Sequence, residues 1–534
     1  MSTASLSRRA LLFGTLPALA VSAMCAKAAT GRSVPTLAAL RSTRGADGEV
    51  VSVTAPGVGG PFRWDARAFA VDDGVLAIAP AGGGSGRWVR DTSGGLDVRW
   101  FGAATNASAA INTAAFSAAS AAISRASGGT LLVPAGTYRV GIQRRDRGRE
   151  GRFIAAEVIR IEGCRAPVAI LGRGAILKAA NGLRFGAFDP RTAAPHPSRL
   201  PFVDGDFRAD APVMVHVEGC SGPVRIEGLT LDGNAGAYAL GGEWGDTGRQ
   251  VGGDGILCVS NTGGVSITDV RCRDHGRDGI MLVHYGLQPG SPRYPVTLTD
   301  VTCDRNGRQG LSWVGGTALT AIRCRFTRTG RGKFASAPGA GVDIEAESSV
   351  CRNGRFVQCE FVDNIGVAMV ADSGDSADVR FDRCTFIGTT NWSAWPSKPR
   401  FVFRDCLFVG SIVRVWGSPD PVQATQFIGC RFHGDPALSP TRQVYGGFLG
   451  DLGAGATNVL MQNCDFRAVA PGIALLWTPA DMRFDNCRFT QAGPGQSYPR
   501  GIFTGNNRID SAGPVGPYGS QIRGRLVLNG QAVS

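Results

Sequence analysis

The sequence lacks several features that would assign it to common functional classes. It contains no C-x-x-C pair, although close cysteine pairs are typical of metal sites. It shows no helix-turn-helix, zinc-finger or RNP-type motif. After the N-terminal 28 residues, no apolar run is long enough to span a membrane. We therefore expect no bound structural metal, no nucleic acid partner and no membrane span.

The N-terminus has the pattern of an export signal. Arg8 and Arg9 precede an apolar run, and the stretch AKA at residues 26–28 is a small-x-small cleavage site. The stretch SRRALL resembles a twin-arginine signal, the bacterial route for exporting folded proteins. We expect residues 1–28 to be a signal peptide and the mature protein to be periplasmic or secreted.

Positive charge exceeds negative charge, and the formal net charge is +13. A basic surface favours an anionic partner, either nucleic acid or an acidic polymer. A soluble surface that happens to be basic explains the charge equally well. Because nucleic-acid motifs are missing and the chain carries an export signal, an acidic polymer is the favoured partner.

One six-residue phrase recurs along the chain with a cysteine near its centre. FDNCRF occupies residues 484–489, and FDRCTF, FRDCLF, FIGCRF and MQNCDF precede it. The shorter gaps between successive cysteines are about 21 to 25 residues, and the longer ones indicate an inserted loop. A period of this length is typical of solenoids. The series consists of Cys272, Cys303, Cys324, Cys359, Cys384, Cys406, Cys430, Cys464 and Cys487.

Apolar and polar residues alternate within each phrase, as in FVQCEF at residues 356–361, which predicts short strands joined by turns. The 76 glycines suit those turns. Repeated units of this kind predict an all-β parallel β-helix, in which equivalent residues stack about 4.8 Å apart. Cysteine packs as a small hydrophobe, so we interpret the series as a structural ladder. Metal or redox chemistry is the alternative, and the missing close pairs disfavour it.

The residues ahead of the repeats resemble a known family. DVRWFGA at residues 97–103, a helix predicted over residues 108–126, and GGTLLVPAGTY at residues 128–138 resemble the entrance of the pectate-lyase-like right-handed β-helix proteins. That family includes pectin-degrading hydrolases, polysaccharide lyases, epimerases and phage tailspikes. GGPFRWDA and the following glycine-rich stretch are similar to the small module that precedes the β-helix in tailspike-like proteins. One departure is AATNASAA, which stands where the family often carries acidic residues.

These patterns predict four regions. They are a signal peptide at 1–28, a glycine-rich module at 29–96, a right-handed parallel β-helix at 97–510 and a C-terminal tail at 511–534. The alanine-rich helix would cap the open apolar end of the solenoid. The resemblance also leaves a trimer open, since tailspike-like relatives are often trimers.

Five segments align on a glycine that opens a strand, and we expect one parallel ladder. In GAGVDIEAE, the apolar Val342 and Ile344 would face the core. Asp343 and Glu345 would then face outward, roughly 6.6 to 7 Å apart, a spacing that suits an inverting glycosidase. A solvated strand face is the alternative. The other segments are GGDGILCV, GRDGIMLVHY, GRQGLSWV and NIGVAMVA, which place Leu257, Met281, Ser312 and Ala368 at the outward position of Asp343.

Two further groups are candidates for proton transfer. Asp254 and Asp278 occupy the same turn position in adjacent coils and would stack about 4.8 Å apart. Carboxylates that close repel, so one tends to stay protonated and can act as an acid; capping of backbone donors is the alternative. His275 and His284, two of only five histidines, could each be a general base, although a surface histidine usually has no such role.

Aromatic and cationic side chains in this region are candidates for holding a polysaccharide. Aromatic rings stack on sugar faces, and cations attract acidic groups. The insertion NWSAWPSKP adds two tryptophans to the wall of a groove. The predicted substrate-binding residues are Arg277, Tyr285, Trp244, Trp313 and Lys333.

The predicted function is an exported enzyme that cleaves an acidic polysaccharide, with two chemistries open. In hydrolysis, which the four clustered carboxylates favour, one carboxyl protonates the glycosidic oxygen and another activates water or attacks, and no cofactor is needed. In β-elimination, His275, His284 or Tyr285 removes a proton beside a uronate carboxylate, which a basic side chain or a Ca²⁺ ion neutralises. A non-catalytic polysaccharide-binding or cell-surface protein on the same scaffold is the second hypothesis.

Overall fold

The computed structural model describes residues 32–145, 153–197, 207–242, 251–453, 455–516 and 519–533. The predicted signal peptide lies outside these residues. The chain divides into two compact units, Met1–Asp91 and Thr92–Ser534, and each is described by itself. Within the described residues, no helix is long and apolar enough to cross a membrane.

The N-terminal unit is a small sheet with one short helix, α1 (Leu37–Arg41). The rings of Trp64 and Trp88 fill its core and meet edge to face at 5.2 Å. Gly86 has a φ of 89° and lies against the Trp64 ring, where a Cβ would come within 2.3 Å, so this close approach requires glycine. The strand order is β1-β2-β3-β5-β4, with β1 (Ser33–Val34), β2 (Val50–Val53), β3 (Gly60–Asp65), β4 (Ala77–Ile78) and β5 (Arg87–Arg90).

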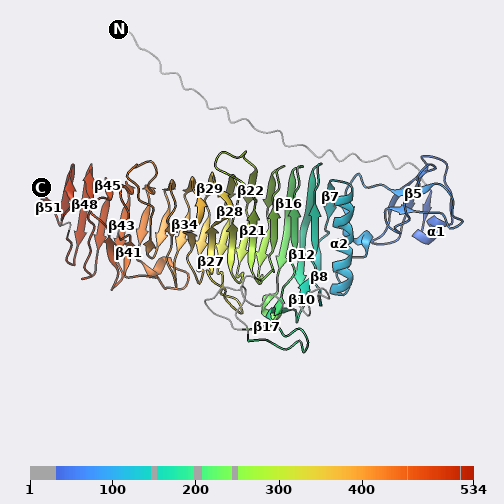
Figure 1. Cartoon of the computed structure of the whole chain (residues 1–534), viewed down its shortest axis with the longest axis horizontal. Coiled ribbons are helices and arrows are strands. Elements are labelled where there is room, and N and C mark those ends of the chain that lie inside the picture. The colour runs from blue at the N-terminus through green and yellow to red at the C-terminus, as the bar shows by residue number, and fades with distance from the viewer. Residues whose placement is uncertain are drawn as a thin grey trace, which may run out of the picture. The chain divides into compact units, whose positions relative to one another are not determined.

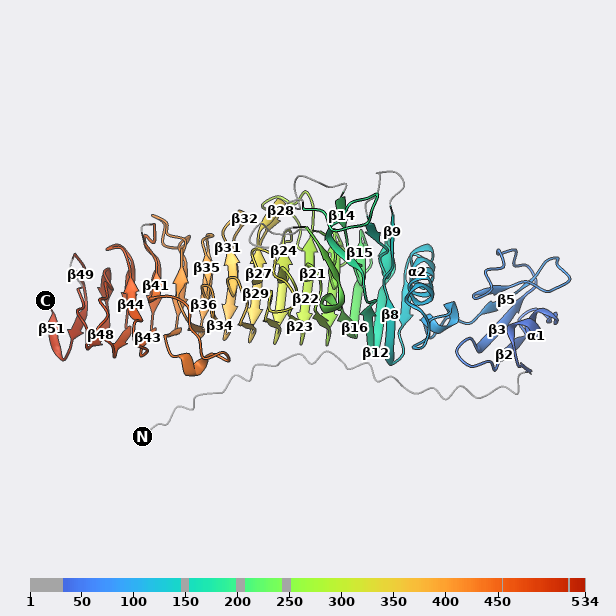
Figure 2. The same ribbon diagram turned by 90° about the horizontal axis from the view of Figure 1, so that it is seen from below.

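The second unit is a parallel β-helix, which confirms the fold predicted from the repeats (Figures 1 and 2). The helix α2 (Ala109–Arg125) packs on its first coil, and the Ser108 hydroxyl accepts a hydrogen bond from the Ile111 N–H at the start of that helix. Phe116 of α2 meets Tyr138 edge to face at 5.6 Å. The helix therefore covers the apolar end of the solenoid, as predicted.

Each coil contributes strands to three parallel ladders. The first ladder contains β11 (Ile159–Glu162), β15 (Val215–Glu218), β18 (Ile256–Val259), β21 (Asp278–Val283), β24 (Gln309–Trp313), β27 (Ala340–Ile344), β31 (Met369–Ala371) and β35 (Trp395–Pro396). Strands β12 (Val168–Ala179) and β16 (Val224–Asp232) are long enough to enter both other ladders.

The second ladder continues through β19 (Val265–Thr268), β22 (Pro295–Thr299), β25 (Ala318–Ile322), β29 (Gly354–Val357), β33 (Val379–Asp382), β36 (Phe401–Arg404), β39 (Gln426–Ile428), β42 (Leu460–Gln462) and β45 (Arg483–Asp485). The third continues through β20 (Arg271–Arg273), β23 (Thr302–Asp304), β26 (Arg325–Thr327), β30 (Glu360–Val362), β34 (Thr385–Ile387), β37 (Leu407–Val409), β40 (Arg431–His433), β43 (Asp465–Ala468), β46 (Arg488–Gln491) and β48 (Asn506–Ser511).

The cysteine phrase marks the short turn from the second ladder to the third. The residue before the turn cysteine is left-handed, as at Asn486 (φ 53°), and the cysteine after it is buried. This confirms the structural role, but the nine cysteines form two sets rather than one ladder. Cys272 and Cys303 lie in third-ladder strands, in register with Phe326. Seven occupy the turn: Cys324, Cys359, Cys384, Cys406, Cys430, Cys464 and Cys487.

Insertions at the turns from the third ladder to the first build an additional five-stranded sheet beside the main solenoid (Figure 1). Its order is β17-β13-β14-β10-β9. Because first-ladder strands begin directly after these turns, the insertions lie where the acidic strand segments start. The strands are β9 (Gln143–Arg145), β10 (Phe153–Ala155), β13 (Arg184–Ala187), β14 (Arg208–Ala209) and β17 (Ala239–Gly241).

Candidate active site

The aligned segments form the expected ladder, with one correction. Strands β18, β21, β24 and β27 pair in the predicted register, which puts Ser312 opposite Asp343. In the fifth segment, Val370 rather than Ala368 lies opposite Asp343. The carbonyl groups of residues 367 and 368 accept hydrogen bonds from the backbone of residues 341 and 342 before β31 begins. The last strand is therefore displaced by two residues from the prediction.

Asp343 projects from the outer face of the ladder but keeps only 4% of its surface exposed. The Gln309 side-chain amide donates a hydrogen bond to Asp343 Oδ2. Burial, and then the nearby charge of Glu345, raise the pKa of Asp343 to about 8, although the Arg308 guanidinium opposes the shift. A carboxyl group held neutral at pH 7 can donate a proton.

Glu345 is the second outward carboxyl group of this coil. It follows β27, and its backbone N–H bonds to the Trp313 carbonyl oxygen, so the chain keeps the ladder register. The residue is half-buried, and the Ser373 hydroxyl donates a hydrogen bond to Glu345 Oε1 at 2.6 Å. The coil thus carries two carboxyl groups in different environments, one enclosed and one partly open to solvent, as a division between acid and base requires.

Asp254 and Asp278 do meet one coil apart, but arginines separate their charges. Arg277 forms a bidentate pair with Asp254, with distances of 2.8 Å from Nε and 2.6 Å from Nη2. Asp278 Oδ2 lies 3.8 Å from Arg277 Nε and 3.5 Å from Arg308 Nη1. Burial, opposed by both arginines, raises the pKa of Asp278 to about 6. Repulsion from Asp254, the cause expected from the sequence, contributes less than burial and the two arginines.

The roles predicted for Asp254 and Asp278 therefore need correction. Both residues are fully buried, so neither can contact a polymer in this conformation. Their hydrogen bonds and ion pairs instead hold the guanidinium groups of Arg277 and Arg308 against the ladder. We assign the two aspartates to positioning. Of the four predicted carboxyl groups, Asp343 keeps a small exposed fraction and Glu345 is half-buried, so these two are the ones that reach the surface.

Four buried polar atoms around Asp343 have no hydrogen-bond partner among the described residues. They are Asp278 Oδ1, Arg308 Nε, Gln309 Oε1 and Ser312 Oγ. Ser312 is the strand neighbour of Asp343, and Gln309 already donates to it. Buried polar groups are almost always paired, so this concentration on one face requires an explanation such as a bound ligand or water.

Aromatic rings lie beside Asp343 toward the C-terminal end of the ladder. Trp395 pairs in register with Val370, which in turn pairs with Asp343. The rings of Trp392 and Trp395 meet edge to face at 5.3 Å, and Tyr445 lies 5.9 Å from Trp392. Both tryptophans are half-buried. The predicted aromatic wall is thus about two strand spacings, roughly 9.6 Å, from the acidic coil.

Two predicted site residues belong to the interior. His275 is buried, its Nε2 lies 3.0 Å from the Leu231 carbonyl oxygen, and burial lowers its pKa. Trp313 is buried because it alternates with the outward Ser312 and pairs with the core residue Ile344. The predictions that His275 acts on substrate and that Trp313 binds it were therefore wrong.

The remaining predicted residues are not grouped with the carboxylates. His284 follows the far end of β21, stacks on Tyr294 at 4.7 Å, and has its pKa lowered by burial. Tyr285 comes next and is 62% exposed. Lys333 donates a hydrogen bond to the Tyr238 carbonyl oxygen at 2.6 Å and lines a separate cavity of about 530 Å³ in the inserted turns. Trp244 lies outside the described residues.

Sequence reasoning missed Arg308, Gln309 and Ser312, which surround Asp343 and Asp278. The signal was present in the alignment of GRDG with GRQG, which makes Arg308 the counterpart of Arg277. Within the part of the chain that the structure describes, no group of three or more His, Cys, Asp or Glu residues could hold a metal ion.

Comparisons with known proteins give a family match for the N-terminal module and distant structural similarities for the solenoid. Residues 33–93, less than half of the chain, match the phage tail protein small four-stranded beta-sheet domain. A comparison with curated proteins finds no match.

Among solved structures, the chain is similar to a tailspike of Acinetobacter baumannii bacteriophage Fri1, described as a capsular polysaccharide depolymerase, with 13% identity and a TM-score of 0.45 over 91% of this chain and 75% of that one. It is also similar to the A-module of the Azotobacter vinelandii mannuronan C-5 epimerase AlgE4, with 14% identity and a TM-score of 0.40 over 80% and 98%. The enzymatically active domain of bacteriophage CBA120 tailspike protein 2 gives 12% identity and 0.42 over 94% and 62%. These values are low, and the assignment of the chain as a parallel β-helix rests on its own strand ladders.

Proposed function

We propose that the protein is an exported carbohydrate-active enzyme that cleaves an acidic polysaccharide by hydrolysis of a glycosidic bond at Asp343 and Glu345. The observation that carries this proposal is the enclosed Asp343 carboxyl, whose pKa is raised to about 8, beside a second carboxylate on the same strand face. Glycosidases usually act through two carboxyl groups, and the environments of these groups give them different pKa values.

In the proposed reaction, Asp343 donates its proton to the glycosidic oxygen, and Glu345 activates a water molecule on the opposite face of the sugar ring. Side chains two residues apart on an extended chain are separated by roughly 6.6 to 7 Å. That value lies at the lower end of the range for inverting enzymes, about 6.5 to 9.5 Å, and above the range for retaining ones. The proposal therefore includes inversion at the anomeric carbon.

The surroundings of the pair suit an acidic sugar chain that runs along the solenoid. The Arg277 side chain lies two coils from Asp343 in the ladder, pairs with Asp254 and keeps 17% of its surface exposed, where it can meet an acidic group of the polymer. Trp392 and Trp395 offer aromatic surface toward the C-terminal side. On the N-terminal side, the outer face becomes apolar around Leu257 and Met281. A chain lying across this face would meet apolar, acidic and aromatic surface in turn.

β-Elimination has less support than hydrolysis. That reaction needs a base beside the uronate carbon, and the predicted bases were His275, His284 and Tyr285. His275 is enclosed in the interior, while the other two follow the opposite end of β21 from Asp278. Hydrolysis uses only Asp343 and Glu345, two of the carboxyl groups that the coil already carries.

The test uses the mature protein with a panel of polyuronates and acidic bacterial exopolysaccharides, following new reducing ends and ultraviolet absorbance together. We expect reducing ends without absorbance, and NMR of the first product should show inversion. The Asp343→Asn variant keeps an oxygen that can accept from Gln309 but cannot donate a proton, so the rate should fall about 10² to 10⁴-fold.

Asp465→Asn, a strand carboxylate in a C-terminal coil, is the matched control and should retain the wild-type rate. Absorbance rising with reducing ends would identify a lyase and overturn the hydrolytic assignment. An unchanged rate in Asp343→Asn would remove Asp343 from the reaction. If the whole panel is bound without cleavage, a polysaccharide-binding protein is the better description.

A further inference from the structure

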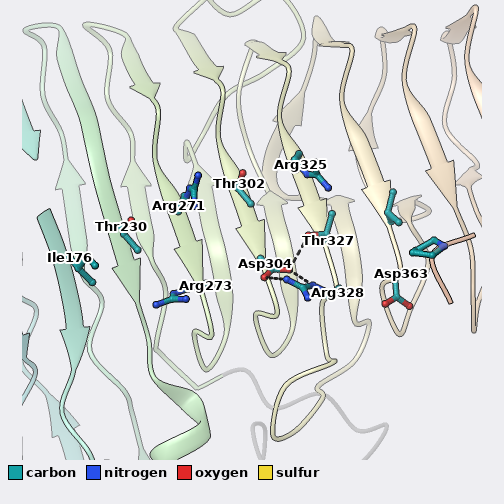
Figure 3. A pocket seen from close by; sticks show the side chains of 12 residues that line it. Ile176, Thr230, Arg271, Arg273, Thr302, Asp304, Arg325, Thr327, Arg328 and Asp363 are labelled. Atoms are coloured by element: carbon teal, nitrogen blue, oxygen red, sulfur yellow. Dashed lines mark hydrogen bonds and ion pairs between the residues drawn. The ribbon is translucent and has the colours of Figure 1, made fainter. Parts of the chain in front are cut away.

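A basic groove lies on the outer face of the third ladder, a different ladder from the one that carries Asp343. Its volume is about 720 Å³, and it crosses six strands from β12 to β30 (Figure 3). Five strand spacings make it about 24 Å long. Pro440, in the loop that follows β40, lines one end of the groove. The groove is therefore long enough for several units of a polymer.

One row of the groove alternates hydroxyl and guanidinium groups. Thr230, Arg271, Thr302 and Arg325 pair in register on four neighbouring strands, and Figure 3 shows them along the groove. Among the described residues, Arg271 has neither an ion pair nor a side-chain hydrogen bond, and the two threonine hydroxyls have no side-chain partner. These groups are available to a ligand.

A second row of lining residues, two positions further along the same strands, forms ion pairs with neighbouring aspartates. Arg273 lies 2.9 Å from Asp232, and Arg328 forms a bidentate pair with Asp304 at 2.7 and 2.5 Å. Figure 3 shows the Arg328–Asp304 contact. The four lining arginines outnumber the two lining aspartates, but Asp232, Asp304 and Glu360 already pair with Arg273, Arg328 and Arg325. The uncompensated positive charge of the groove therefore belongs to Arg271.

The same outward position has a different composition in the C-terminal coils. There it holds Arg431, Asp465, Arg488 and Arg508 on successive strands, so one acidic residue lies between two of the three cations. In the groove, the neighbours of Arg271 are threonines, and only Arg325, at the edge, has an acidic neighbour, Glu360, at 3.2 Å. Threonine is common on exposed strands, but in this row the two hydroxyls also flank Arg271, where they can pair with a ligand that the guanidinium attracts.

We propose that this groove is a second, non-catalytic binding site for an acidic polysaccharide. The inference takes only the polymer class from the proposed function. Arginine forks bind carboxylates bidentately, and threonine hydroxyls can pair with sugar hydroxyls. Cations on every second strand, roughly 9.6 Å apart, would meet acidic groups that recur along an extended sugar chain. Among the described residues that line the groove, none is aromatic, which disfavours single-stranded nucleic acid because its bases stack on aromatic rings.

The experiment measures binding of polygalacturonate, polymannuronate and a neutral glucan to the full chain carrying Asp343→Asn, so that cleavage cannot interfere. We expect one or both polyuronates to bind, the neutral glucan not to bind, and affinity to fall with added salt. Adding Arg271→Ser with Arg325→Ser should weaken polyuronate binding about tenfold. The matched control is Arg488→Ser, which lies at the same row position outside the groove and should leave affinity unchanged.

Cleavage by the chain with Asp343 intact separates this inference from the proposed function. With the groove arginines replaced, a long polymer should be cleaved more slowly while short oligosaccharides are cleaved at the wild-type rate. If the wild-type chain cleaves no polymer, and replacing Arg271 and Arg325 still weakens polyuronate binding, the groove assignment stands and the proposed enzymatic function is wrong. Equal affinities in the groove and control variants, no preference for polyuronates over the glucan, or tighter binding of a single-stranded oligonucleotide would each overturn the groove assignment.

Discussion

The central coils, residues 251–371, and the C-terminal coils, residues 379–509, share the second and third ladders but differ in which side chains they enclose. The C-terminal coils stack phenylalanines in their interior. Phe386, Phe408 and Phe432 lie face to face at 4.8 and 4.9 Å with ring planes within 7°. The central coils have Cys272 and Cys303 at the corresponding strand position and enclose charged groups on an outer face.

This difference distinguishes residues that stabilise the solenoid from residues whose burial does not stabilise it. Stacked rings and turn cysteines bury apolar surface, and the thiols of the turn cysteines lie against backbone carbonyl oxygens, as Cys406 Sγ does at 3.5 Å from the Phe381 oxygen. Asp278, Gln309 and Ser312 instead have buried polar atoms without partners among the described residues. Such groups lower stability unless something binds them. The C-terminal coils, with their stacked rings, therefore contribute mainly to stability. The central coils, with their buried polar groups, are the better candidates for a catalytic or binding site.

The largest expected effect is the pH dependence of folding stability that Asp343 causes in the central coils. Its pKa is raised from 3.8 to about 8 in the folded protein. Between about pH 4 and pH 8 the folded state keeps a proton that the unfolded chain releases, so this group makes folding stability fall as pH rises. Asp343→Asn should remove that dependence. Its free energy of unfolding should match the wild type below pH 4 and exceed it by a growing margin up to pH 8.

Urea unfolding at pH 4, 6 and 8 measures this margin. The wild-type cleavage rate should also fall above pH 8, because Asp343 then loses the proton that it donates. A margin that stays constant with pH would contradict the enclosed, neutral carboxyl group.

The next contrast concerns the regular coils. Phe408→Ala removes a fully buried ring between Phe386 and Phe432, and the cavity should lower the free energy of unfolding by about 3 to 5 kcal/mol. Cys303→Ala, at the same strand position in a central coil, removes one sulfur atom and should cost about 1 kcal/mol. Denaturant unfolding compares the two variants. Equal decreases in the free energy of unfolding would mean that the central and C-terminal coils depend equally on this buried strand position.

Much of the fold follows from the sequence because it depends on local periods. The alternation within FVQCEF gives the strands, the recurrence of the phrase gives the coil, and a glycine before each first-ladder strand gives the register of four strands. Asp343 and Glu345 were found by the same alternation. That rule also excludes Trp313 from the surface, since its neighbour Ser312 faces outward, so this error was avoidable.

The rest of the site depends on contacts that no local period encodes. Asp254, Asp278 and His275 are buried because side chains from other coils and the inserted turns enclose them, including Arg308, which is 30 residues from Asp278. The two-residue displacement of β31 depends on where residues 367 and 368 find hydrogen-bond donors. The basic groove depends on register across inserted loops, which brings Arg271 and Arg325 within two strands of each other.

The smallest expected effect tests whether the unpaired groups around Asp343 are kept for function. Ser312 is buried, and its hydroxyl has no partner among the described residues, so Ser312→Ala should leave the free energy of unfolding unchanged or raise it by about 1 kcal/mol. Ser497 is also buried, but its hydroxyl accepts a hydrogen bond from the Leu475 N–H at 2.8 Å. Ser497→Ala should therefore lower the free energy of unfolding by about 1 to 3 kcal/mol. Cleavage should respond in the opposite way, falling several-fold in Ser312→Ala and staying unchanged in Ser497→Ala. If Ser312→Ala loses stability and keeps full activity, the Ser312 hydroxyl stabilises the fold, as the Ser497 hydroxyl does, and is not kept for catalysis.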